Sequence, residues 1–282
     1  MCKLNRDKMF GFVNTLLLLV LTFLILYPLY FTIIASVSDP SEVVNGSVTF
    51  LPKGFSMDSY KAVFKENSIW RGYGNSIVYT LLGTLLNLIL TIPAAYALSK
   101  KHMRFRRVIN TYFVFTMFFS GGMLPGYLLV KDLGLINKPY TLILLGGLSV
   151  YNVIVARTYF MSSIPDSIYE AAEIDGCSEF GKFFKIAIPL AKPIIAVITL
   201  YYAVGRWNDY FTSLIYISDS DYFPLQLVLR NILQGSQVKL SAMDTSSMAS
   251  EELLYLIKQA NLAEAMKYAV IFIASLPMLI IY

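Results

Sequence analysis

A polar loop at residues 165–189 has the residue types and spacing of a contact surface for another protein. It contains the run Tyr169–Gly176 (Tyr-Glu-Ala-Ala-Glu-Ile-Asp-Gly) and ends on Ile186–Pro189. Alanine favours helix and leaves a shallow surface, and a glycine after it is suited to end the helix. We expect a helix–turn–helix that docks on a partner through non-covalent contacts. The expected docking residues are Glu170, Ala171, Ala172, Asp175, Gly176, Phe180 and Phe183.

An ordinary loop is the alternative interpretation of the same residues. Ser167 and Glu170 have the spacing of a capping box, which would give Glu170 a purely local role. The complete spacing of the loop, and its place between two long apolar segments, favour the docking interpretation.

Residues that usually support catalysis are scarce in this chain. His102 is the single histidine, and it lies in a basic loop, where one imidazole cannot build a metal site. Cys2 and Cys177 are too few for a disulfide framework. The sequence also lacks the Gly-x-x-x-x-Gly-Lys-Ser/Thr phosphate loop. We therefore assign no catalytic, cofactor-binding or metal-binding residues and expect the chain not to be an enzyme.

The composition indicates a membrane protein. Of the 282 residues, 56% are hydrophobic and only 15% are charged, with a mean hydropathy of +0.60. A soluble domain carries about 25% charged residues. The net charge of +5 is modest, and its placement beside apolar segments points to membrane orientation and not to nucleic acid.

Six apolar stretches are long enough to span a bilayer as helices, which need about 20 residues each. The first is too long for a signal peptide, so we expect a retained helix. The predicted spans are 11–37, 73–99, 108–131, 140–164, 190–217 and 266–282. The predicted fold class is thus an all-α membrane protein with six transmembrane helices.

Basic residues set the predicted orientation. Lys3, Arg6 and Lys8 precede the first span, Lys182 and Lys185 lie in the polar loop, and the segment 100–107 carries five lysines and arginines. If the spans alternate, these three segments share one side, which the positive-inside rule makes cytoplasmic. Both termini are then cytoplasmic.

The polar loop resembles the coupling loop of permease subunits in binding-protein-dependent ABC importers. The pattern in that family is Glu-Ala-Ala, three residues, Gly, nine residues, Ile-x-Leu-Pro, and this chain departs from it only by Ile188 in place of leucine. Ser120–Pro125, Leu133–Leu135 and Gly205–Phe211 look like segments of carbohydrate-type permeases. The chain is similar, over essentially its whole length, to the smaller permease of the maltose importer.

This resemblance implies the type I ABC importer permease fold and a multi-pass protein of the cell membrane. It implies a function in which ATPase closure drives alternating access and oligosaccharides move inward. The implied partners are a second permease subunit, two ATPase subunits and an extracytoplasmic solute-binding protein. ATP and Mg would bind to the ATPase partners, and this chain would bind no cofactor. Residues 1–72 would form the first helix and an extracytoplasmic segment, and 73–282 the transmembrane domain. Family members continue into a basic tail, so we expect the chain to be truncated at Tyr282.

Polar and aromatic side chains in the predicted spans are candidates for the cargo path, because sugars need hydrogen bonds and flat faces. They are Tyr151, Asn152, Tyr202, Trp207, Asn208 and Asp209, with Asn87 and Tyr201 as further candidates. The alternative is helix–helix hydrogen bonding for the asparagines and an interfacial belt for Trp207. Arg206 is spaced to pair with Asp209.

The outward segment near 234–256 is expected to be a loop that contacts the binding protein. The candidate residues are Gln234, Gly235, Ser236 and Gln237. The alternative is a solvated loop that only rests on the binding protein.

Three other functions were weighed. An importer permease for a non-sugar solute would share the coupling loop. A secondary transporter or channel would need ionisable residues in the membrane and often inverted repeats, yet the first four spans hold almost none and no repeat is evident. A membrane enzyme would need a cluster of acids, histidines or metal ligands.

Overall fold

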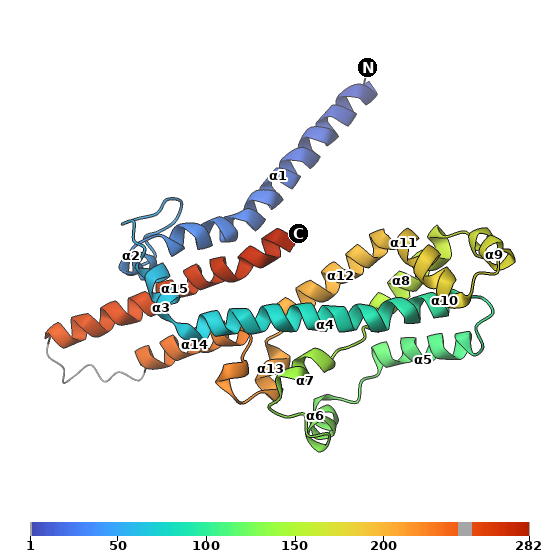
Figure 1. Ribbon diagram of the computed structural model, residues 1–282. Helices are drawn as coiled ribbons and strands as arrows, with labels where there is room; N and C mark the ends of the chain where they lie inside the picture. Colours follow the sequence, from blue (N-terminus) through green and yellow to red (C-terminus); the bar gives the residue numbers. More distant parts are fainter. Residues whose placement is uncertain (1, 242–249, 282) are drawn as a thin grey trace. The chain divides into compact units, whose positions relative to one another are not determined.

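The computed structural model describes residues 2–241 and 250–281 (Figure 1). The regular elements in these ranges are helices, as predicted. They are α1 (Cys2–Ser36), α2 (Pro40–Val44), α3 (Asp58–Lys65), α4 (Asn67–Ser99), α5 (Arg106–Phe118), α6 (Met123–Asp132), α7 (Pro139–Leu144), α8 (Val150–Ser163), α9 (Asp166–Ile174), α10 (Glu179–Gly181), the π-helical η1 (Lys182–Ala187), α11 (Ile188–Leu190), α12 (Lys192–Trp207), α13 (Phe211–Tyr216), the 3-10 turn η2 (Ser220–Tyr222), α14 (Leu225–Ser241) and α15 (Ser250–Ile281).

By their contacts the residues form two compact units. One comprises 1–69 and 229–280, and the other is essentially Trp70–Val228. The C-terminal stretch 229–280, which the sequence-based division placed with 73–282, therefore groups with the N-terminal residues.

The first unit is organised around the end of α1. Ile34 and Ala35 pack with Val43 and Val48, and Tyr268 of α15 covers this cluster. Most apolar side chains between Met9 and Ile33 of α1 face outward, and the most apolar stretch of Lys8–Ser36 buries none of its residues in the structure. A helix that is apolar all round and unburied suits a lipid environment.

The second unit has one core built by helices from distant parts of the chain. It joins α4, α8 and α12 with the polar loop that carries α9 and η1. The buried members are Ile92, Ala95, Tyr96, Leu98, Val153, Ala156, Phe160, Ile164, Tyr169, Phe183, Ala187, Ala191, Ile194, Ile198 and Tyr202.

Within the described ranges, three helical stretches are long and apolar enough to cross a membrane: Lys8–Ser36, Asn67–Ser99 and Ile257–Ile280. Two bent pairs of helices raise the number to five if each pair is one span. The structure therefore supports a helical membrane protein with several spans, and the predicted number of six stays a prediction.

Three predicted spans are not single helices. The span 108–131 is divided between α5 and α6, which meet at 110°. In the span 190–217, α12 ends at Trp207 and α13 begins at Phe211. The span 140–164 is interrupted between α7 and α8, where 145–149 is not helical. Irregular backbone at membrane depth requires partners from the protein itself, and the site described below supplies them for α7.

Candidate functional site

The polar loop folds as the helix–turn–helix that its sequence predicts. Its first helix, α9, ends in a Schellman motif: Cys177 N–H donates to Ala172 O at 2.8 Å, and Gly176 N–H donates to Glu173 O at 3.0 Å. Gly176 has φ of +74°, a conformation that glycine adopts without strain. This turn directs the chain into α10, whose first turn is capped by Ser178, which accepts from Gly181 N–H at 3.2 Å.

A buried lysine connects the two halves of the loop. Lys182 Nζ donates to Glu173 Oε2 at 3.2 Å and contacts Glu179 Oε1 at 2.6 Å. Its side chain is only 5% exposed although both glutamates face solvent. A buried cation needs such partners, so this cluster holds α9 against α10.

Aromatic packing attaches the loop to the apolar helices. Tyr96 of α4 contacts Phe160 of α8, Tyr169 of α9 and Phe183 of η1, with ring centroids 5.7, 6.1 and 5.0 Å apart. Interiors this densely packed transmit displacement instead of absorbing it. The loop and α4, α8 and α12 thus share one core.

Two lysines next to α4 add polar contacts at the base of the loop. Lys101 Nζ pairs with Asp166 Oδ2 at 2.7 Å. The ammonium group of Lys100 lies over the rings of Tyr96 and Tyr169. Burial lowers the pKa of Lys100 to about 8 and raises the pKa of the Tyr169 phenol to about 12.

The exposed face of the loop differs in part from the predicted docking surface. Glu170, Ala171, Asp175, Gly176 and Phe180 are exposed as a docking role requires. Ala172 and Phe183 are buried, so the prediction that these two present themselves to a partner is wrong. The spacing of the apolar residues in the sequence does not reveal which side of η1 faces the core.

The apolar part of that face comes from three side chains. Ile174 is 88%, Phe180 79% and Phe184 60% exposed. Ile174 was missed by the sequence analysis, although it directly precedes the acid–glycine turn. Large apolar side chains exposed on a polar loop indicate a protein contact surface. We call Glu170, Ile174, Phe180 and Phe184 the docking face.

The second candidate region is the interruption between α7 and α8. Arg206 of α12 extends its guanidinium across it. Nη1 donates to Leu142 O at 2.6 Å and to Leu145 O at 2.8 Å. Nη2 donates to Ile143 O and Gly146 O, each at 3.2 Å. The last carbonyls of a helix lack intrahelical donors and attract positive charge, so Arg206 completes the end of α7.

Side chains of α4 and α12 complete this polar network. Arg206 Nε donates to Asn87 Oδ1 at 3.0 Å, and Asn87 Nδ2 donates to Gly146 O at 2.7 Å. The Tyr202 hydroxyl accepts from Ser149 N–H at 3.0 Å and lies 2.6 Å from the Thr91 hydroxyl. Gly146 has φ of +68°, which permits the sharp turn at this point.

The predicted pairing of Arg206 with Asp209 is wrong. The guanidinium is directed to the carbonyls of the interruption, and Asp209 Oδ1 accepts from Thr212 N–H at 3.0 Å instead. The sequence signal that could have indicated the true partners is an arginine inside an apolar stretch together with Gly146-Gly147 in the middle of another.

An open hollow of about 390 Å³ lies beside this network. Tyr202, Asn208 and Asp209 from the predicted cargo path line it, and so does Tyr201. The remaining lining residues are Leu145, Gly146, Gly205, Arg206 and Thr212. Hydroxyl, amide and carboxylate groups beside aromatic rings are the chemistry that a carbohydrate requires.

Four other candidates for the cargo path do not line this hollow. Trp207 is buried against Tyr73, with ring centroids 5.6 Å apart. Asn152 is buried on α8 and Tyr151 is exposed on the same helix. Asn87 is buried and serves the network around Arg206.

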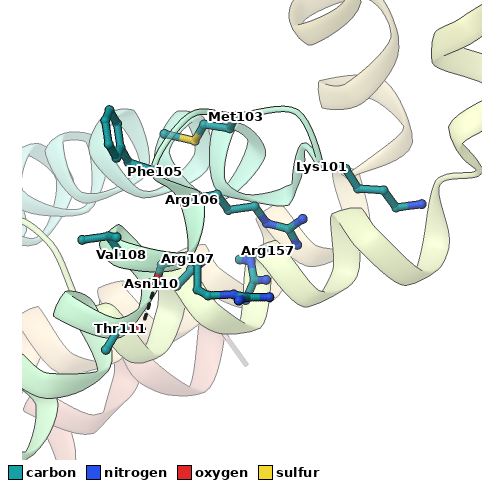
Figure 2. Close-up of a pocket in the computed structure, with 9 residues that line it drawn as sticks. All are labelled: Lys101, Met103, Phe105, Arg106, Arg107, Val108, Asn110, Thr111 and Arg157. Carbon is teal, nitrogen blue, oxygen red and sulfur yellow. Dashed lines mark hydrogen bonds between the residues drawn. The ribbon is translucent and has the colours of Figure 1, made fainter.

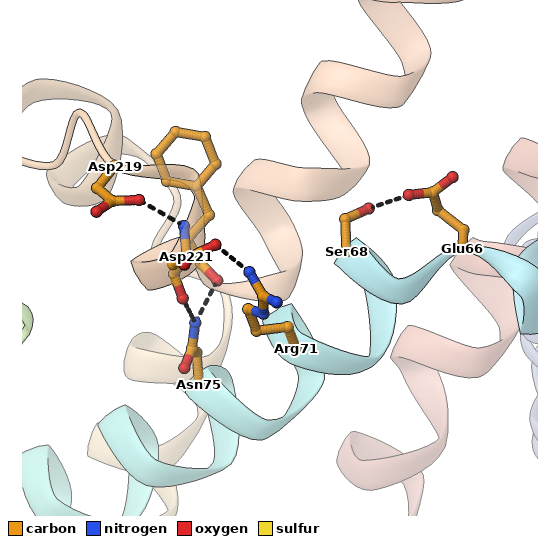
Figure 3. Close-up of polar contacts among 7 residues, drawn as sticks. Glu66, Ser68, Arg71, Asn75, Asp219 and Asp221 are labelled. Carbon is orange, nitrogen blue, oxygen red and sulfur yellow. Dashed lines mark hydrogen bonds and ion pairs between the residues drawn. The ribbon is translucent and has the colours of Figure 1, made fainter.

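At the opposite end of α4, polar contacts join the helix start to the segment after α13 (Figure 3). Arg71 forms an ion pair with Asp221, and Asn75 Nδ2 donates to Asp221 O at 2.8 Å and Phe223 O at 3.0 Å. Asp219 Oδ1 accepts from Asp221 N–H and shapes the turn η2. These contacts hold the segment 219–223 against α4.

The predicted binding-protein loop is largely helical. Gln234, Gly235, Ser236 and Gln237 belong to α14, which ends at Ser241, and α15 resumes at Ser250. Gln234 is exposed. Residues 242–249 of the predicted loop lie outside the described residues.

Comparisons with known proteins agree with one another. The family described as "Binding-protein-dependent transport system inner membrane component" matches residues 68–282. Protein LplC of Bacillus subtilis (strain 168) is 38% identical over 278 residues, 99% of this chain and 90% of the relative. The polygalacturonan/rhamnogalacturonan transport system permease protein YtcP of the same organism is 35% identical over 98% of this chain and 93% of its own length. A solved structure of a bacterial ABC transporter involved in the import of the acidic polysaccharide alginate superposes with a TM-score of 0.85 at 34% identity, covering 98% of this chain and 95% of that chain.

Proposed function

The chain belongs to the family of binding-protein-dependent transport system inner membrane components, and we propose that its docking face receives the movement of an ATPase and passes it to the hollow beside Arg206. As a multi-pass permease subunit of a sugar ABC importer in the cell membrane, it is not itself a catalyst. It works with an ATPase and a binding protein, which the family description implies.

The single observation that carries this proposal is the shared core. Tyr169 and Phe183 of the loop pack in one cluster with Tyr96 of α4 and Tyr202 of α12. Tyr202 also lines the hollow. A push on the docking face therefore reaches the hollow through contiguous packed side chains, and packed interiors respond by shifting as units.

The importer's cargo is an oligosaccharide or polysaccharide, and we propose an acidic one. The YtcP relative is a permease for polygalacturonan or rhamnogalacturonan, and the similar solved structure concerns alginate import. These names favour uronic-acid chains over neutral ones. The hollow carries the Asp209 carboxylate as well as the Arg206 guanidinium and so favours neither kind by charge; uptake of oligogalacturonate against a neutral oligosaccharide of equal length tests the cargo.

The assembly that we propose has this permease, a second permease subunit, two ATPase subunits that hold ATP and Mg, and an extracytoplasmic solute-binding protein. The same proposal includes six membrane spans with both termini cytoplasmic, and it assigns residues 73–282 to the transmembrane domain. The family match over 68–282 supports that domain. Exposed Gln234 in α14 is the described candidate for a contact with the binding protein.

The experiment that tests coupling replaces exposed aromatic residues of the docking face. The double variant Phe180→Ser and Phe184→Ser should insert normally but lose most of the co-purifying ATPase and reduce uptake at least tenfold, because exposed aromatic anchors supply much of an interface's binding energy. The matched control is Phe55→Ser, which is also exposed at 74% and lies in the predicted outer segment. Normal ATPase recovery and uptake in the double variant would overturn the proposal.

A further inference from the structure

A basic pocket at the start of α5 is not used by the proposed function. It encloses about 630 Å³ and is lined by residues of the α4–α5 connection, the first turns of α5 and one residue of α8. The lining residues are Lys101, Met103, Phe105, Arg106, Arg107, Val108, Asn110, Thr111 and Arg157 (Figure 2).

Three arginines converge in this pocket. Figure 2 shows the guanidinium groups of Arg106, Arg107 and Arg157 close together, while Lys101 points away from them. Lys101 is paired with Asp166. Among the residues that the structure describes, no acidic side chain forms an ion pair with any of the three arginines. Arg157 Nε donates to Leu98 O at 3.0 Å and Arg106 Nη2 contacts Met161 Sδ at 3.3 Å.

Neighbouring like charges without a counter-ion oppose folding, so this arrangement calls for an anion. Arginine forks bind phosphate in a bidentate manner. The helix α5 begins at Arg106 without a side-chain cap, and its first backbone N–H groups add to the positive field. The shared chemistry of the expected ligand is a phosphate ester.

The surroundings of the pocket select a lipid as the source of that phosphate. Along α5, Val108, Tyr112 and Phe115 are 65%, 63% and 52% exposed, and none of the helix's residues is buried. These side chains extend from the arginines along a predicted span and would meet acyl chains. A free phosphate would gain nothing from them. Basic pockets at the cytoplasmic ends of transmembrane helices are suited to anionic headgroups.

We propose that Arg106, Arg107 and Arg157 form a binding site for the phosphate of an anionic phospholipid in the cytoplasmic leaflet, with the exposed side chains of α5 against its acyl chains. This proposal depends on the predicted membrane orientation of the chain, and it does not depend on the role of the docking face. By holding a lipid at the joint between α4 and α5, it anchors the bent pair α5–α6 at the membrane surface.

The test is native mass spectrometry of the assembled importer titrated with phosphatidylglycerol or with phosphatidylcholine in detergent. The importer should retain phosphatidylglycerol at least tenfold better than phosphatidylcholine. The double variant Arg106→Gln and Arg107→Gln should lose about tenfold or more in phosphatidylglycerol affinity, since each basic residue near the surface contributes a severalfold effect. Arg157→Gln should lower the phosphatidylglycerol affinity as well. Because Arg157 also donates a hydrogen bond to Leu98 O, this variant could fail to fold. In that case the double variant decides the test.

The matched control is Arg104→Gln, an exposed arginine of the same connection that does not line the pocket. It should change the affinity less than twofold. An equal loss in Arg104→Gln would reduce the effect to general surface charge and overturn the site. Displacement of the lipid by millimolar glycerol phosphate would assign the pocket to a soluble phosphate. Absence of any lipid preference in the assembled importer would overturn the site.

Discussion

In the polar loop, the hydrogen bonds that set the shape join residues three to nine positions apart, such as Gly176 with Glu173 and Lys182 with Glu173. The hydrogen bonds that Arg206 itself donates join residues 60 to 119 positions apart. The loop is shaped by local rules of helix capping, whereas the hollow exists only after distant helices have packed. The two regions should therefore respond differently to substitution.

The largest effect is expected from Arg206→Met. The change leaves the carbonyls of Leu142, Ile143 and Leu145 without the arginine donor, while Gly146 O keeps its bond from Asn87. Each unpaired buried group costs about 1–3 kcal/mol, so the folded protein should be lost. The measurement is the yield of monodisperse protein after mild detergent extraction. Arg206→Lys keeps the charge with fewer donors and should give an intermediate yield. A wild-type yield from Arg206→Met would show that the interruption stabilises itself.

The next effect is expected from Gly176→Val, which acts on the loop alone. The left-handed conformation at φ of +74° costs a non-glycine residue about 1–2 kcal/mol, and more if it is β-branched. Uptake should be abolished while insertion and yield stay normal, because the turn that sets the docking face is distorted. Gly176→Asn, which tolerates this conformation, should retain most of the uptake. Normal uptake in Gly176→Val would contradict the coupling role of the turn.

A smaller effect is expected from Gly83→Ala in α4. A Cβ at Gly83 would lie 2.9 Å from Arg206 Nε, so the guanidinium must shift and its bonds to the interruption weaken. We expect a loss of about 1–3 kcal/mol, seen as a lower unfolding temperature in detergent. Gly74→Ala on the same helix meets nothing within 4 Å and is the matched control. Equal melting of the two variants would mean that Arg206 accommodates the methyl group.

The smallest effect is expected from the titration of Lys100. Its pKa of about 8 in the folded protein lies below the value near 10.4 of an unfolded chain. The unfolded state then binds more protons between these values, so stability should rise as the pH increases from about 8 to 10. The gain should be on the order of 1 kcal/mol, because the side chain is only half-buried. Lys100→Gln should remove this slope in unfolding measured against pH, and an unchanged slope would assign it to another group.

Much of the loop could be predicted from the sequence. Glu170-Ala171-Ala172 and the acid–glycine turn specify a helix and its end through interactions within a few residues. The burial of Phe183 and the exposure of Ile174 could not be predicted in the same way. The burial of Phe183 depends on Tyr96 of α4, which packs on it from a distant part of the chain.

The structure brings only some of the predicted cargo residues together. Tyr202, Asn208 and Asp209 do line a common hollow, because Tyr202 lies near the end of α12 and the other two directly follow the helix. Trp207 does not, although it lies between them, since it packs on Tyr73. The sequence predicted an ion pair between Arg206 and Asp209 because only partners that are close along the chain, such as residues at i and i+3, can be recognised from sequence.

The sequence by itself determined that this chain is a helical membrane protein with a helix–turn–helix loop, because low charge, long apolar runs and helix caps are local properties. The tertiary structure decided where the helices are interrupted, which face of the loop is exposed, and which arginines lie together in one pocket. Those outcomes depend on backbone carbonyls, rings and charges that meet only when α4, α8 and α12 pack together. No spacing within a single segment of the chain encodes them.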